Sequence, residues 1–141
     1  MTRAALFVLV VLVMLAAGCG GTPLDDYEDK LVLGTKLVDG GVSGITTSFT
    51  IPSGSNTVLI HWAIESKYDI GGGRELAMLI EQKTGGTFVE RRFITYPEIQ
   101  EADIYYIIDS FSHSFGTGAF RATVISGIRK VASREYTVRF E

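Results

Sequence analysis

The segment VLIHWAIE, residues 58–65, decides the fold because apolar side chains occupy every second position in it. Trp62 lies among the alternate positions that are all apolar. Leu59 and His61 lie among the intervening positions, which are both polar and apolar. A period of two is typical of a β-strand with one face buried. The pattern therefore predicts a strand with Trp62 as its largest inward-facing side chain.

The same period recurs on both sides of this segment. We predict further strands at residues 31–37, 45–51, 75–82, 88–96, 104–108, 120–125 and 136–141. Turn residues separate them, including Asp39-Gly40-Gly41 and Pro52 to Asn56. Residues 66–74 and 109–118 are expected to be loops, and residues 97–103 a single helical turn or a loop.

Residues 75–82 also contain strong helix formers, so a helix is the alternative there. We favour a strand, because KTGGT at 83–87 is typical of a hairpin turn and residues 88–96 supply an aromatic and β-branched partner.

The fold class predicted from this pattern is all-β. Seven to eight short strands without intervening helices indicate an antiparallel sandwich, with a small closed β-barrel as the alternative. The 8 Phe, 6 Tyr and 16 Gly of the 141 residues agree with a chain rich in strands and turns. With a single cysteine, the core has to hold the domain without an internal disulfide.

The last two predicted strands carry a weak family resemblance. GAFRATV at 118–124 and REYTVRF at 134–140 look like the closing strand pair of bacterial immunoglobulin-like domains. The resemblance implies an immunoglobulin-like sandwich.

The N-terminus has the layout of a secretory signal peptide. Arg3 precedes an aliphatic run over residues 4–15, and small residues at 16–18 follow. The run is shorter than the roughly 20 residues of a spanning helix, so we expect a removable signal helix.

The segment LAAGC, residues 15–19, resembles the lipobox of bacterial lipoproteins. The resemblance implies cleavage between Gly18 and Cys19, lipidation of the Cys19 thiol, and acylation of the new amino end by a fatty acid such as palmitate. Gly20 implies sorting to the outer membrane in a host with two membranes. A plain secretory signal with an incidental cysteine is the alternative.

Three parts of the chain follow: a lipoprotein signal peptide at 1–18, a lipid-anchored acidic linker at 19–30 and a β-sandwich domain at 31–141. The linker lacks the ligand spacing of an EF-hand. A net charge of −3 argues against a nucleic acid partner, which requires a concentrated basic face.

Asp109, His113 and the serines between and beside them suggest a hydrolase, but the residues of a triad usually converge from separate segments. On an extended chain Asp109 and His113 point to one side and the serines to the other. No G-x-S-x-G elbow is present, so we predict no catalytic residues.

Neither metal nor cofactor is expected. His61 and His113 are the only histidines and lack metal-ligand spacing. Gly71-Gly72-Gly73 before Arg74 does not complete a phosphate-binding motif.

Tyr68, Arg74, Tyr96 and His113 are the candidate residues for a binding surface. The aromatic side chains of a candidate sugar-stacking surface are Trp62, Tyr68, Tyr96, Tyr105 and Tyr106.

We expect a membrane-anchored lipoprotein of the bacterial cell envelope with a non-catalytic binding or structural module, its partners being membrane lipid and an envelope protein or glycan. An envelope hydrolase or glycan-binding protein is the alternative function.

Overall fold

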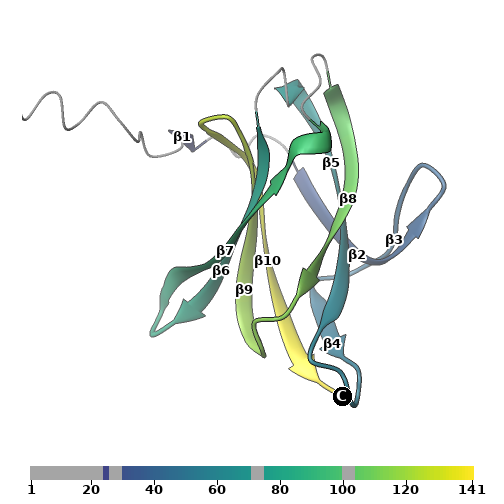
Figure 1. Ribbon diagram of the computed structural model, residues 1–141, viewed down its shortest axis with the longest axis vertical. Coiled ribbons are helices and arrows are strands. Elements are labelled where there is room, and N and C mark those ends of the chain that lie inside the picture. The colour runs from purple at the N-terminus through teal and green to yellow at the C-terminus, as the bar shows by residue number, and fades with distance from the viewer. Residues whose placement is uncertain (1–23, 26–29, 71–74, 100–103) are drawn as a thin grey trace, which may run out of the picture.

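Two open β-sheets pack face to face in the computed structural model, which describes residues 24–25, 30–70, 75–99 and 104–141 (Figure 1). The larger sheet has the strand order β1-β10-β9-β6-β7, and β4 also pairs with β10. The smaller sheet has the order β3-β2-β5-β8. The all-β class and the sandwich are confirmed, and the closed barrel is excluded because the sheets do not join.

The larger sheet consists of β1 (Leu24–Asp25), β4 (Ser48–Ile51), β6 (Leu76–Thr84), β7 (Thr87–Tyr96), β9 (Gly118–Ser126) and β10 (Arg129–Phe140). The smaller sheet consists of β2 (Lys30–Val38), β3 (Gly41–Ile45), β5 (Val58–Ile70) and β8 (Ile104–His113). A short 3₁₀-helix, Pro97–Ile99, follows β7, where we expected a helical turn or a loop.

Aromatic side chains fill the space between the sheets. Trp62 on β5 is fully buried and meets Tyr96 on β7 edge to face, with ring centroids 5.7 Å apart. Tyr136 on β10 contacts Phe49 at 6.0 Å and stacks on Phe120 at 5.6 Å. The predicted inward anchor, Trp62, is therefore confirmed, and it packs across the core on the opposite sheet.

The predicted strand at 45–51 is wrong, because the chain changes sheets within it. β3 ends at Ile45 in the smaller sheet, and β4 begins at Ser48 in the larger one. At this corner the Thr46 amide donates a hydrogen bond to the Leu33 carbonyl at 3.1 Å, and the Thr137 amide donates to the Thr47 carbonyl at 2.8 Å. β4 consequently lies parallel to β10, so the sandwich is not purely antiparallel.

Other boundaries differ where polar residues continue a strand. β5 extends to Ile70 through the expected loop, and β8 extends to His113. The β8 extension is paired with β5 throughout, from Asp109 opposite Trp62 to His113 opposite Val58, which satisfies backbone groups that a loop would leave to water. In the β5 extension the register shifts after Glu65, and pairing resumes at Ile70, opposite Ile104. β1 places Leu24 and Asp25, expected in an extended linker, parallel to Arg129 and Lys130 of β10.

Residues 75–82 form a strand, as favoured from the sequence. β6 pairs with β7 through the hairpin at Gly85-Gly86 and with β9 on its other side. Leu76, Met78 and Ile80 are buried in the core. The helical alternative is excluded, because tertiary packing outweighs helix propensity here.

A pair of substitutions on β5 tests the assignment of its two faces. Ile60→Ala removes a fully buried side chain and is expected to lower the free energy of unfolding by about 2–5 kcal/mol. Leu59→Ala, on the exposed face, is expected to change it by about 0.5 kcal/mol or less. Urea unfolding followed by Trp62 fluorescence measures both, and equal losses would contradict the assignment.

Candidate functional site

The β2–β3 hairpin extends away from the sandwich (Figure 1). It carries large exposed apolar side chains. β2 stays in register with β5 from Lys30 to Gly34, and beyond Gly34 its described partner is β3. Leu37, Val38 and Ile45 are 51%, 50% and 59% exposed, and we call these three residues the hairpin patch. Because Leu37 and Val38 are consecutive in a strand, they point to opposite faces, so each face of the hairpin carries a half-exposed apolar side chain.

Local sequence fixes the position of this hairpin. Gly40 has φ of 81° in the turn, and the Tyr106 hydroxyl of β8 donates a hydrogen bond to its carbonyl at 3.1 Å. Gly34 allows β3 to approach closely, because a Cβ there would lie 2.6 Å from the Ser43 carbonyl oxygen. The hairpin is thus tied at its tip and at its base while its apolar side chains face solvent.

The hairpin has the features of a strand-addition site. β3 is the outermost strand of the smaller sheet, so one side of its backbone faces away from the sheet. Such an edge can pair with an extended segment of another chain, and adjacent apolar side chains add affinity and specificity. Exposed apolar groups at an edge strand are otherwise an aggregation hazard.

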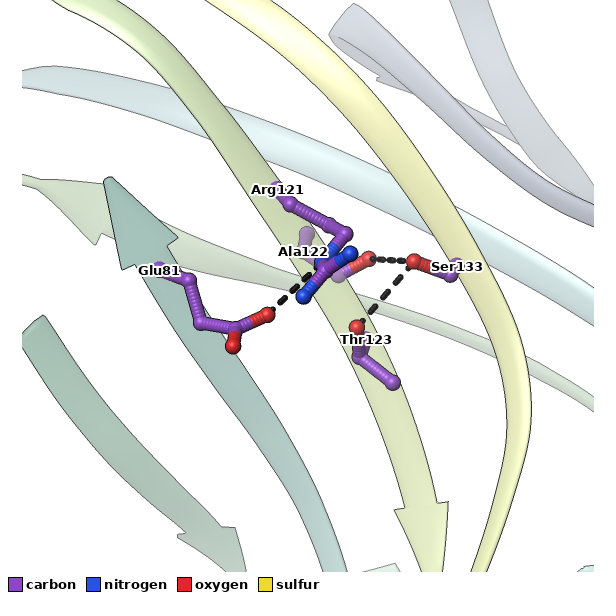
Figure 2. Close-up of polar contacts among 5 residues, drawn as sticks. All are labelled: Glu81, Arg121, Ala122, Thr123 and Ser133. Carbon is purple, nitrogen blue, oxygen red and sulfur yellow. Dashed lines mark hydrogen bonds and ion pairs between the residues drawn. The ribbon is translucent and has the colours of Figure 1, made fainter. Parts of the chain in front are cut away.

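A polar cluster crosses the outer face of the larger sheet (Figure 2). The Arg121 Nε donates to Glu81 Oε2 at 2.7 Å, and the guanidinium lies 4.1 Å from the centroid of the Phe88 ring. Thr123 and Ser133 share a hydrogen bond of 3.1 Å between their hydroxyl oxygens. These contacts link β6, β7, β9 and β10.

This cluster is a structural clamp rather than an acid–base site. The Glu81 carboxylate is held by the Arg121 guanidinium at hydrogen-bond distance, which ties β6 to β9. A guanidinium stacked on an aromatic ring is likewise held in one orientation.

Of the four predicted surface residues, the structure describes the side chains of two. Tyr96 and His113 are buried in the core, Arg74 lies outside the described residues, and the side chain of Tyr68 on β5 is not among those described. This corrects the expected exposure of Tyr96 and His113. Because successive side chains in a strand alternate between its two faces, the positions of Tyr96 in β7 and His113 in β8 direct both side chains into the core.

The three members of the proposed sugar-stacking set whose side chains are described do not share one surface. Trp62 and Tyr96 contact each other in the core, whereas Tyr106 is half exposed elsewhere, with its hydroxyl on the hairpin turn. The side chain of Tyr105 lies outside the described residues.

His113 is a core histidine with both ring nitrogens engaged. Its Nε2 lies 2.9 Å from the Gly116 carbonyl, which only accepts, so Nε2 carries the proton. Nδ1 therefore accepts from the Tyr136 hydroxyl at 3.1 Å. Desolvation lowers the pKa of His113, with the Gly116 hydrogen bond opposing it, and burial raises the pKa of Tyr136.

The polar run at 109–114 does not assemble into a catalytic set. The Asp109 side chain accepts a hydrogen bond from the amide of Ser110 at 2.7 Å. His113 is directed into the core, whereas Ser112 is exposed on the other side of β8, as the strand parity predicted. No nucleophile–base pair forms among these residues.

Within the described ranges, no group of three His, Cys, Asp or Glu residues is arranged to bind a metal ion. His61 lies on the face of β5 opposite Trp62, and its Nδ1 is buried without a hydrogen-bond partner. The same part of the chain contains no helix of the length and apolarity needed to cross a membrane. Gly18, Cys19 and Gly71-Gly72-Gly73 lie outside it.

Comparison with protein families and with curated proteins gives no match. Among solved structures, the chain is similar to an immunoglobulin-like protein from Pseudomonas aeruginosa, with 15% identity, a TM-score of 0.48, and coverage of 86% of this chain and 100% of that one. It is also similar to a β-glucosidase from Listeria innocua solved with glucose, with 14% identity, a TM-score of 0.40, and coverage of 79% of this chain. The chain corresponds to 16% of that glucosidase.

Sequence reasoning missed the hairpin patch. Leu37 fits the alternation of residues 31–37, which by itself indicates a buried position. The available signal was Gly34, since a glycine within a strand pattern often marks a close backbone approach or a bend. Residues beyond such a point need not share the burial of residues before it.

Acidification is expected to destabilise the domain through His113. Above pH 6.5 the side chain is neutral in both the folded and the unfolded chain and adds no pH dependence. Below that value the unfolded chain binds a proton that the folded state excludes, so stability is lost as the pH falls toward the lowered pKa. Urea unfolding between pH 7.5 and 5 measures this loss.

His113→Gln should flatten that pH dependence, and His61→Gln, which replaces the other histidine, should retain it. An unchanged slope in His113→Gln would contradict the assignment.

Proposed function

We propose that this protein is a lipid-anchored component of the bacterial cell envelope whose β-sandwich acts as a non-catalytic binding module. The observation that carries the proposal is the hairpin patch, because large apolar side chains on an edge hairpin are unfavourable in water unless a partner covers them. The partner is an envelope protein that contributes an extended segment to the edge of β3.

Anchoring rests on the sequence at residues 15–19. The lipobox resemblance accounts for the only cysteine of an exported chain, which has no partner for an internal disulfide. Two or more acyl chains make membrane attachment stable, whereas one chain binds only marginally. The protein then occupies the periplasmic side of a membrane, the outer membrane in a two-membrane host.

A role without catalysis agrees with the geometry of the polar residues. Both ring nitrogens of His113 are engaged within the core, and Glu81 is held by Arg121. General acid–base catalysis requires a group within reach of bound substrate, and the contacts of both residues are internal to the domain.

Mass spectrometry of the mature protein tests the anchor. We expect a chain that begins at Cys19 and carries a diacylglycerol group and an additional acyl chain. Cys19→Ala should abolish lipidation and leave the protein outside the membrane fraction. A mature chain with unmodified Cys19 would contradict the proposal.

Site-specific crosslinking in cells tests the binding module. A photoreactive amino acid at Val38 or Ile45 should yield a defined adduct with an envelope protein. The matched control is Val89, a 45% exposed apolar residue on the β6–β7 hairpin, where no such adduct is expected. Equal adducts at all three positions, or none at Val38 and Ile45, would overturn the assignment of the hairpin patch.

A further inference from the structure

The turn between β9 and β10 presents an exposed apolar side chain at one end of the sandwich. Ile128 is 59% exposed, and the amide of the preceding Gly127 donates a hydrogen bond to the Glu75 carbonyl at 3.1 Å, which holds the turn against the start of β6. Tight turns usually place glycine, asparagine, aspartate or serine at such positions. An isoleucine there is unfavourable in water.

The strand β1 brings the N-terminal end of the domain to the same turn. Leu24 is in register with Arg129 and Asp25 with Lys130, directly after Ile128. Neighbouring strands lie about 5 Å apart. Figure 1 shows β1 beside this turn and the C-terminus at the opposite end of the molecule.

The distance from Cys19 to this end is limited by chain length. Four residues, 20–23, lie between Cys19 and Leu24. The five Cα–Cα steps from Cys19 to Leu24, at about 3.5 Å each, span at most about 17 Å. β10 runs from Arg129 to Phe140, which at about 3.3 Å per residue is about 36 Å. The tether is thus much shorter than the domain, so the end with Ile128 stays close to the bilayer when Cys19 is lipidated.

We infer that the β9–β10 turn docks on the bilayer surface, with Ile128 inserted among the lipid headgroups and the long axis of the sandwich pointing away from the membrane. The inference rests on the proposed lipidation of Cys19. Arg129 and Lys130 follow the turn, and exposed Glu75 lies beside it, so the charge at this end is mixed. Docking therefore depends on insertion of an apolar side chain into the bilayer surface rather than on attraction between charges.

This orientation fits the proposed binding role. In Figure 1 the C-terminal end of β10 and the β6–β7 hairpin lie away from the end that carries the β9–β10 turn, and the β2–β3 hairpin projects to one side. A sandwich lying flat on the membrane would instead bring one sheet face into contact with lipid.

Single-cysteine fluorescence tests the orientation, because acylated Cys19 leaves no other thiol in the chain. Ile128→Cys, Phe140→Cys and Val89→Cys introduce probes at residues that are 59%, 61% and 45% exposed, so each variant should fold. Each lipidated full-length variant is labelled with bimane and incorporated into vesicles of phosphatidylethanolamine and phosphatidylglycerol. Flotation of the vesicles reports anchoring independently of the probe.

The account predicts a blue-shifted emission and strong quenching by headgroup-nitroxide lipids for the probe at residue 128 only. Floating protein with equal quenching at residues 128 and 140, or with the strongest quenching at residue 89, would overturn the orientation and leave anchoring intact. Protein that does not float would overturn both proposals. A blue shift in native envelope but not in pure lipid vesicles would assign the turn to a protein partner and overturn lipid docking.

Discussion

The aromatic contact between the two sheets is the interaction on which the remaining structure depends. Trp62 from β5 meets Tyr96 from β7 with no covalent cross-link to assist them, because the only cysteine lies outside the domain. The indole N–H is buried without a partner, which costs about 1–3 kcal/mol. Burying a tryptophan removes roughly 150–250 Å² from water and contributes about 4–6 kcal/mol, so packing outweighs that loss.

The polar groups described inside the domain and on the outer face of the larger sheet join neighbouring strands. His113 joins β8 to β10 through Tyr136, while Arg121 and Glu81 clamp the outer face of the larger sheet. The chain changes sheets at Thr46 and Thr47, which leaves the preceding hairpin outside the sandwich. The proposed binding edge is therefore a consequence of the topology.

The fold class was predictable because apolar residues at every second position indicate which side chains of a strand are buried, as they did for Trp62 and Ile60. Sheet order was not, since alternation does not say which strands pair or where the chain changes sheets, and residues 45–51 were wrongly assigned to one strand for this reason. The candidate site was less predictable still. From the sequence, His113 is predicted to be a polar loop residue, because its hydrogen bonds to Gly116 and Tyr136 are not apparent there. The exposure of Leu37 depends on the close approach of β3 at Gly34.

Amide hydrogen exchange compared between native envelope and vesicles of extracted lipid tests the central claim most directly, because contact with lipid is common to both samples. The account predicts additional protection in native envelope confined to β3 and the adjoining half of β2, with β5 and β9 unchanged. Identical exchange of the hairpin in both samples, or new protection centred on another surface, would contradict the account.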